Sequence, residues 1–299
     1  MGEDKMSKKT ELKVAVIQRE LSVDVAKNKQ KIKDAIKEAS KNGAKLIVLQ
    51  ELHNTEYFCH KEDVRFFDLA ESIPGPSTVE FGELAKELGV VVVLSLFEKR
   101  AAGIYHNSAV VLEKDGSIAG IYRKMHIPDD PGFYEKFYFT QGDIGFKAID
   151  TSVGRLGVLV CWDQWYPEAA RLMALDGAEI LIYPTAIGWD MNDTSEERRR
   201  QLEAWITIQR AHAVANGIPV LVANRAGLDG GVEDSSTFWG NSFICGEQGE
   251  FLAQADNQNE SIIYASLDLA RSDKVRRIWP FFRDRRIDAY GDILKRYGK

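Results

Sequence analysis

Residues 155–184 have the sequence RLGVLVCWDQWYPEAARLMALDGAEILIYP, and this stretch decides the fold class. Residues 155–160 and 179–183 are short and mainly apolar, which predicts two strands. Between them, Pro167 suits the first turn of a helix, and Gly177 suits the residue that ends it. Strand, helix and strand in this order are typical of an α/β protein.

The first half of the chain shows the same alternation. Its predicted elements are strand 13–18, helix 24–42, strand 46–49, a second helix closed by Gly89, and strand 90–96. Ser77 and Glu80 have the spacing of a capping box, in which the serine accepts an orphan N–H and the glutamate reaches back. We therefore expect the second helix to begin at Ser77. Strand 90–96 is almost wholly apolar, as expected where both faces of a strand are covered.

A hairpin separates this half from the second half. Residues 105–113 and 117–125 are predicted to pair around an Asp115-Gly116 turn. Beyond residue 184 the predicted elements are helix 195–216 and strands 219–223, 241–245, 251–255 and 262–267, and strand 146–150 precedes the quoted stretch. Two helix-bearing halves around a hairpin predict two sheets packed together with helices outside. Because no Pro/Gly/Ser-rich linker divides the chain, we expect residues 1–299 to form a single domain.

The composition is that of an ordinary globular protein, with 44% hydrophobic and 28% charged residues. The net charge of −6 disfavours binding to nucleic acid or to an anionic membrane surface. Charged residues interrupt every apolar stretch, so we expect no membrane span. Residues 1–11 lack the apolar centre of a signal peptide, and we expect a flexible extension there. The three cysteines are an odd number, which favours a reducing, cytoplasmic setting over a disulfide framework.

Cys161 is the first candidate for a catalytic group. It ends an apolar strand just before the helix opened by Pro167, and such a turn exposes a nucleophile near backbone N–H groups that can hold an oxyanion. The helix dipole can also lower the pKa of a thiol from its free value of about 8.5. The alternative is that Cys161 is a small buried hydrophobe, as most free cysteines are. Cys59 and Cys245 lack this setting and are interpreted as structural.

Two further strand ends carry charged residues that suit a thiol-based reaction. Glu51 directly follows the apolar stretch LIVLQ and could serve as a base. Lys124 stands at the end of the return strand of the hairpin and could stabilise an oxyanion. Each residue alone could equally be a solvated loop charge. The three signals support one another only if the strands share a sheet edge, which the sequence does not establish.

Three blocks of sequence resemble the motif blocks of the nitrilase superfamily of carbon–nitrogen hydrolases. They are VLQELHNTEYF at 48–58, YRKMHIPDDPGFYEKFYFTQGD at 122–143 and VLVCWDQWYPEAARLMALDGAEILIYPTAIG at 158–188. The likeness extends from Val14 to the strands near Leu267. It implies an α/β four-layer α-β-β-α sandwich, usually dimerised, and so a homo-oligomer that is at least a dimer.

The resemblance also implies a role for each matched residue. Glu51 matches the general base, Lys124 the lysine that stabilises the oxyanion, and Cys161 the nucleophile. Glu135 matches a second glutamate that positions the substrate and the lysine, although alone it would be interpreted as a loop surface charge. The backbone N–H of Trp162 is expected to join Lys124 at the oxyanion.

Within the superfamily, the chain is most similar to N-carbamoylputrescine amidohydrolases. Hydrolases of N-carbamoyl-D-amino acids place paired arginines after the nucleophile, where they hold the substrate carboxylate. This chain has Gln164 and Trp165 at those positions, which favours a substrate without a carboxylate, namely a carbamoylated amine. The alternatives are another amidase or carbamoyl-amino-acid hydrolase of this superfamily, or a non-catalytic scaffold with the same fold.

The amine end of such a substrate is a cation and requires carboxylates or aromatic faces. Tyr57, Asp163, Trp189 and Asp190 lie near the motif blocks and could supply them. For Trp189 and Asp190, the alternative is a partly exposed loop without contact to substrate.

Other ligands and partners have little support in the sequence. His53, Cys59 and His60 do not have the spacing of a zinc site, and no phosphate-binding glycine motif is present, so we expect no metal and no cofactor. Residues 270–299 mix arginines with aromatic and acidic residues. We interpret them as an arm that packs at a dimer interface rather than as a nucleic-acid site.

Overall fold

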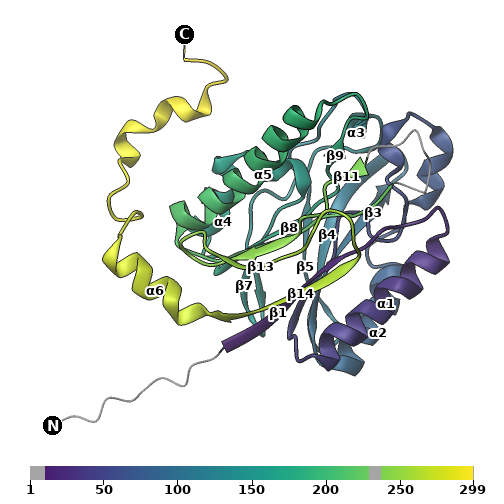
Figure 1. Ribbon diagram of the computed structural model, residues 1–299, viewed down its shortest axis with the longest axis horizontal. Helices are drawn as coiled ribbons and strands as arrows, with labels where there is room; N and C mark the ends of the chain where they lie inside the picture. The colour runs from purple at the N-terminus through teal and green to yellow at the C-terminus, as the bar shows by residue number, and fades with distance from the viewer. Residues whose placement is uncertain (1–10, 229–236, 299) are drawn as a thin grey trace.

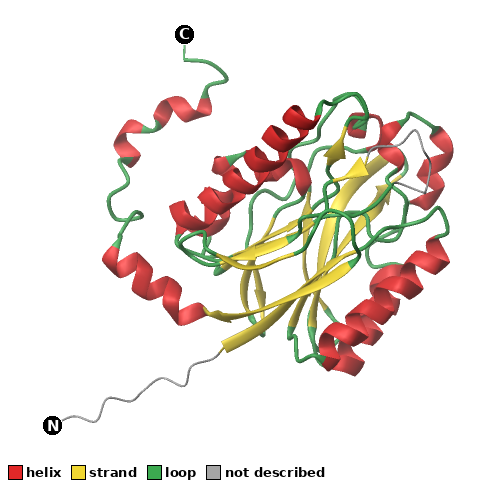
Figure 2. Cartoon of the chain, viewed as in Figure 1, coloured by secondary structure: helices red, strands yellow, loops and turns green. Residues whose placement is uncertain are grey.

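The computed structural model describes residues 11–228 and 237–298 of the chain. Two six-stranded mixed sheets form its centre (Figure 2). The first has the order β14-β1-β2-β3-β4-β5, and the second has the order β13-β12-β10-β8-β7-β6. Figure 1 shows α1 and α2 on the outside of one sheet and α4 and α5 on the outside of the other. The predicted pair of sheets with helices outside is therefore confirmed.

The strands of the first sheet are β1 (Glu11–Gln18), β2 (Leu46–Val48), β3 (Val91–Ala101), β4 (Ile104–Leu112), β5 (Ile118–Arg123) and β14 (Ser261–Asp268). Those of the second are β6 (Ile149–Thr151), β7 (Gly154–Val158), β8 (Ile180–Pro184), β10 (Val220–Ala223), β12 (Phe243–Cys245) and β13 (Phe251–Gln254). β9 (Gly188–Trp189) and β11 (Thr237–Phe238) form a small separate pair. In each large sheet three neighbouring strands run parallel: β1, β2 and β3 in the first, and β7, β8 and β10 in the second.

The helices are α1 (Val25–Lys41), α2 (Pro76–Leu88), the short α3 (Glu135–Tyr138), α4 (Pro167–Leu175), α5 (Ser195–Asn216) and α6 (Leu269–Ile278). α1, α2, α4 and α5 follow the predicted ranges closely, whereas α3 and α6 were not predicted from the sequence. Residue 11, placed in the flexible extension by the sequence, already belongs to β1, and residues 1–10 lie outside the described part. No helix of the described part is both long enough and apolar enough to cross a bilayer.

Side chains along β1 alternate between the two faces of the first sheet, and each face packs into a different apolar cluster. Val14 and Val16 belong to the apolar cluster between the two sheets, whereas Ala15 and Ile17 belong to the cluster beneath α1 and α2. Successive side chains of a strand point to opposite faces, so a sheet covered on both faces needs apolar residues at every position. This is why the strands at the centre of the fold are continuous apolar runs.

The start of α2 differs from the prediction. The helix begins at Pro76, and Thr78 closes the cap by accepting a hydrogen bond from the backbone N–H of Gly75 at 2.8 Å. Proline at the first helical position has a fixed φ and lacks the N–H that would be unpaired there. The predicted capping box at Ser77 and Glu80 was wrong, because the Glu80 carboxylate instead pairs with Lys29 and Lys33 of α1.

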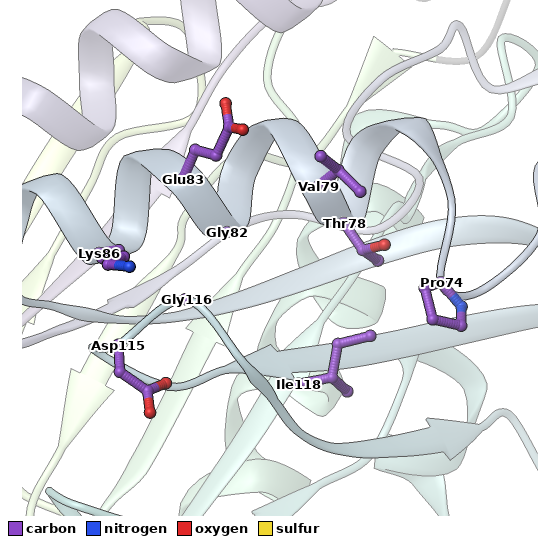
Figure 3. Close-up of a pocket in the computed structure, with 9 residues that line it drawn as sticks. All are labelled: Pro74, Thr78, Val79, Gly82, Glu83, Lys86, Asp115, Gly116 and Ile118. Atoms are coloured by element: carbon purple, nitrogen blue, oxygen red, sulfur yellow. The ribbon is translucent and has the colours of Figure 1, made fainter.

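A contact between two glycines sets how closely α2 approaches the hairpin. A Cβ atom on Gly82 would lie 2.7 Å from the carbonyl oxygen of Gly116, which no side chain tolerates. Figure 3 shows the cavity beside this contact, lined by Val79 and Lys86 of the helix and by Ile118 near the turn, among others. The cavity has a volume of about 300 Å³, and no predicted catalytic residue lines it.

Candidate active site

Three strands from two sheets bring the predicted catalytic residues together. Glu51 follows β2, Lys124 directly follows β5, and Cys161 follows β7. The Nζ atom of Lys124 lies 2.9 Å from Oε1 of Glu51 and 2.6 Å from Oε2 of Glu135. The side chains of Glu51, Lys124 and Glu135 are fully buried. The sequence-predicted acids and ammonium therefore form one charged cluster in the interior.

Cys161 opens a short 3-10 turn, Cys161–Trp165, directly after the strand. Its φ of +45° lies in the left-handed region that L residues avoid, so the backbone is held in a strained turn. Its side chain is 4% exposed. Burial raises the pKa of the thiol well above its usual value; the negative charge of Glu51 adds to this effect, whereas the ammonium of Lys124 opposes it. The thiol is therefore protonated at neutral pH, so a thiolate would form here only with a base that takes its proton.

The carboxylate of Glu51 is asymmetric in its contacts. Oε1 accepts hydrogen bonds from Lys124 at 2.9 Å and from Nδ2 of Asn107 at 2.7 Å. Oε2 is buried and has no hydrogen-bond partner among the described residues. A buried carboxylate oxygen without a donor is suited to take up a proton.

Glu135 and Lys124 form a tightly coupled ion pair. Tyr57 donates a hydrogen bond to Oε1 of Glu135 at 2.7 Å, while Lys124 binds Oε2. Burial raises the pKa of Glu135 to about 7, although the ammonium of Lys124 opposes this shift. Burial also opposes the charge on Lys124, but Glu135 and Glu51 outweigh it and hold the pKa of the lysine well above its usual value. Lys124 is therefore a cation at neutral pH.

Asp163, predicted as a contact for the substrate, is fully buried and held by internal donors. Its Oδ2 accepts from the hydroxyl of Tyr122 at 2.8 Å and from the N–H of Val160 at 2.9 Å. Its Oδ1 contacts the backbone N–H of His126 at 3.1 Å and the Nδ1 atom of His126 at 2.7 Å. Tyr122 and His126 flank Lys124, so Asp163 ties the turn that carries Cys161 to the strand end that carries the lysine. All of these partners belong to the chain itself, so both carboxylate oxygens of Asp163 are already hydrogen-bonded.

The other predicted substrate residues have different surroundings. Trp189 is 8% exposed, and its Nε1 donates to the carbonyl of Arg198 at 3.0 Å. Asp190 is exposed and accepts a hydrogen bond from the N–H of Asn192 at 2.8 Å. Trp162 is partly exposed and packs edge-on against Trp165. None of these contacts joins them to the charged cluster, whereas Tyr57 contacts it directly through Glu135.

Two further residues that hydrogen-bond to Glu51 were not singled out from the sequence. Asn107 lies within β4, in the polar run His106-Asn107-Ser108, where the sequence alone gives no sign of burial. Arg225 follows the apolar strand β10, the same kind of position as that of Glu51. The guanidinium of Arg225 donates to the carbonyl oxygens of Glu51 at 3.0 Å and of Leu52 at 2.8 Å.

The histidines and cysteines do not form a metal centre in the described residues. Across residues 11–228 and 237–298, no three His, Cys, Asp or Glu side chains are grouped so that they could hold a metal ion. His53 is buried, and burial lowers its pKa to about 3, so it is neutral. Its Nδ1 contacts the backbone of Ser95.

Comparison with known proteins gives four consistent matches. The sequence model of the carbon–nitrogen hydrolase family matches residues 13–277. A citrullinase from Francisella tularensis is 42% identical over 96% of this chain and 99% of its own. An N-carbamoylputrescine amidase from Oryza sativa is 42% identical over 95% of each chain. A crystal structure of a carbon–nitrogen hydrolase from Helicobacter pylori G27 is 55% identical, covers 96% of this chain and 100% of its own, and superimposes with a TM-score of 0.93.

Proposed function

The chain belongs to the carbon–nitrogen hydrolase family, as its three motif blocks predicted, and from this premise we propose that it hydrolyses N-carbamoylputrescine. It is an amidohydrolase, and the proposed products are putrescine, carbon dioxide and ammonia. The observation that carries the proposal is the buried cluster in which Lys124 lies between Glu51 and Glu135, with Cys161 at a neighbouring strand end. Release of a diamine would place the reaction in polyamine biosynthesis.

In the first proposed step, Oε2 of Glu51 takes the proton of Cys161, and the sulfur forms a bond to the ureido carbonyl carbon. Negative charge then builds on the carbonyl oxygen. The ammonium of Lys124 and the backbone N–H of Trp162 stabilise that charge. A ureido carbonyl is a poor electrophile, so this stabilisation matters; removing one such donor typically costs about 3 kcal/mol.

The tetrahedral intermediate then loses its terminal amino group. The C–N bond breaks, Glu51 returns the proton to the leaving nitrogen, and ammonia departs while Cys161 keeps a carbamoyl thioester. Glu51 next removes a proton from water, which attacks the thioester carbon. The C–S bond breaks, the sulfur regains a proton, and the released carbamate decomposes to carbon dioxide and the amine. The covalent intermediate divides one difficult step into two easier ones.

The substrate class rests on the residues that follow the nucleophile. Gln164 is buried and its side-chain oxygen accepts a hydrogen bond from Thr185 at 3.1 Å, and Trp165 carries no charge. Neither residue can neutralise a substrate carboxylate. For the cationic amine end we propose the aromatic faces of Tyr57 and Trp189, with the carboxylate of Asp190 next to Trp189 as a further contact.

Citrulline is the second candidate substrate, because the Francisella tularensis relative named a citrullinase is as similar to this chain as the plant amidases are. Citrulline carries the same terminal ureido group but adds an α-carboxylate and an α-amino group. A site without an arginine pair disfavours it, although the same four catalytic groups would act on its ureido carbon.

A coupled ammonia assay tests the proposed function. We expect N-carbamoylputrescine to be hydrolysed with a kcat/KM at least tenfold above that of citrulline, N-carbamoyl-β-alanine, simple amides and nitriles. Preference for citrulline would select the second candidate. Preference for N-carbamoyl-β-alanine would overturn the amine-substrate proposal.

We also propose that the chain forms a homo-oligomer, at least a dimer, through its C-terminal arm, residues 270–299. Figure 1 shows this segment, in yellow, running away from the two sheets beyond α6. The arm exposes large apolar side chains, with Ile278 at 74%, Leu294 at 90% and Tyr297 at 77%. Large apolar side chains exposed in this way are typical of a protein interface, and a second copy of the chain would cover them.

The three cysteines support the proposal of a reducing compartment, the cytoplasm. Cys59, Cys161 and Cys245 are all buried free thiols. A catalytic thiol of this kind needs a setting in which it stays reduced.

A further inference from the structure

Asn107 contacts two of the proposed catalytic residues through two different groups. Its Nδ2 donates a hydrogen bond to Oε1 of Glu51 at 2.7 Å. Its backbone carbonyl accepts a hydrogen bond from the N–H of Lys124 at 2.9 Å. Asn107 is fully buried, and it lies on β4 opposite Phe97 of β3. It therefore links the base and the lysine from a rigid position in the sheet.

The hydrogen bond from Nδ2 of Asn107 to Oε1 of Glu51 fixes the orientation of the carboxylate. Asn107 and Lys124 both occupy Oε1, so the carboxylate cannot rotate without losing two hydrogen bonds. Oε2, which has no partner in the described part of the chain, is left as the oxygen that can take a proton. Hydrogen bonds to an ionised carboxylate are stronger than hydrogen bonds between two neutral groups, so these two bonds hold the Glu51 carboxylate firmly in this orientation.

We propose that Asn107 is a positioning residue whose side-chain amide makes Oε2 of Glu51 the general base. The inference rests on the proposed function to the extent that Glu51 acts as the base. The residue must be neutral, because the site already holds the charges of Lys124, Glu51, Glu135 and the nearby Arg225. An amide supplies a donor without adding a charge.

Two substitutions of similar size test the proposal. Asn107→Leu removes the donor, and Asn107→Asp replaces it with an acceptor that repels Glu51 unless one of the two binds a proton. For both variants we expect kcat to fall roughly 10- to 100-fold while KM changes less than about threefold. We also expect the acid limb of the kcat/KM profile to move to higher pH, by roughly one unit for Asn107→Leu and further for Asn107→Asp.

A matched control separates positioning from folding. Asn216 is also a buried asparagine, but its Nδ2 donates to the carbonyl of His212 at the end of α5. Asn216→Leu is expected to lower the free energy of unfolding without moving the pH profile. If Asn107→Leu keeps the wild-type pH profile and loses activity only in proportion to its folded fraction, Asn107 is merely structural and the inference is overturned.

A second readout does not depend on the substrate. The rate of iodoacetamide alkylation of Cys161, followed by mass spectrometry of its peptide, is expected to show the same shift of its acid limb in the Asn107 variants. If the wild type does not hydrolyse N-carbamoylputrescine, the proposed function fails, whereas the alkylation profile still decides the role of Asn107. If the wild type is active and both variants show unshifted profiles in both assays, only the inference about Asn107 fails.

Discussion

The Nζ atom of Lys124 lies 2.6 Å from Oε2 of Glu135, and both side chains are completely buried. Glu51 binds the same ammonium, so two carboxylates share one cation. Such a cluster carries one excess negative charge in a medium that solvates charge poorly, which favours retention of a proton. This is the physical origin of the raised pKa of Glu135, about 7 against an ordinary value of 4.5.

The raised pKa makes stability depend on pH. Between pH 4.5 and about pH 7, folded Glu135 holds a proton that the unfolded chain has released. Its contribution to stability is therefore complete below about pH 4.5 and is lost as the pH rises through about 7. Glu135→Gln is neutral at every pH and lacks this dependence. As the pH rises from 4.5 to about 7, the wild type loses this contribution and the variant does not. We expect the free energy of unfolding of the variant, relative to that of the wild type, to increase by up to about 3 kcal/mol between these two pH values.

Urea unfolding at pH 4.5, 5.5, 6.5 and 7.5, at one protein concentration, measures this difference. The exposed Glu62→Gln serves as the control and is expected to show no such trend. Parallel stability curves for the wild type and Glu135→Gln would show that Glu135 does not titrate in this range.

Because the backbone at Cys161 is strained, two substitutions that abolish catalysis equally are expected to differ in their effect on stability. Cys161→Ala and Cys161→Gly both remove the sulfur, so we expect no measurable ammonia release from either. Glycine adopts a φ of +45° without the strain that a Cβ imposes. We therefore expect Cys161→Gly to be more stable than Cys161→Ala by about 1 kcal/mol, as measured by thermal unfolding.

The matched control is a pair of substitutions at Cys245, a buried cysteine in β12. There glycine is expected to be less stable than alanine, because a strand gains nothing from a left-handed residue. Residual ammonia release by either Cys161 variant would contradict its role as nucleophile.

The sequence predicted the strand-end residues because strand-end chemistry has a local signal. Glu51 and Cys161 each follow a buried apolar run, and Lys124 follows the hairpin, so their places in the chain made them candidates. The resemblance of the three motif blocks to a known family then selected them from other strand-end residues. Their convergence depends on which strand of one sheet faces which strand of the other. That is a property of packing between layers, and a single sequence gives no measure of it.

Asn107 and Arg225 were missed for a related reason. In the strand of Asn107, a polar residue is equally compatible with an outward-facing position, and only the facing sheet shows that it is buried. Arg225 could not be distinguished from a solvated loop charge. The start of α2 was misplaced because the sequence contains two capping signals side by side, and Pro76 takes precedence over Ser77.

Asp163 is expected to act on catalysis through position. Asp163→Asn replaces an acceptor oxygen with a donor that faces the N–H groups and hydroxyl now bound to it. We expect a loss of about 2–3 kcal/mol in the free energy of unfolding, and a fall in kcat of at least tenfold in the fraction that remains folded. Asp190→Asn, at an exposed site, is the control and is expected to change stability by less than about 0.5 kcal/mol. If Asp163→Asn instead raised KM strongly with kcat unchanged, Asp163 would be a substrate contact after all.

The last part of the C-terminal arm can be removed in a way that keeps α6 in place. α6 is anchored to the body by Arg271, which pairs with Glu247 at 3.1 Å, and by Arg276, which donates to the carbonyl of Asn216 at 3.0 Å. Deletion of residues 287–299 leaves these contacts but removes the exposed side chains of Ile287, Ile293, Leu294 and Tyr297. These side chains are 62% to 90% exposed in the described chain. We therefore expect the full-length protein to be at least a dimer and the truncated protein to shift toward monomer, as measured by light scattering coupled to size-exclusion chromatography. Leu294→Asp and Tyr297→Asp together should produce the same shift without shortening the chain, because a charge in an apolar interface is strongly unfavourable. An unchanged mass for both variants would place the interface elsewhere on the surface, and a monomeric full-length protein would contradict the oligomer itself.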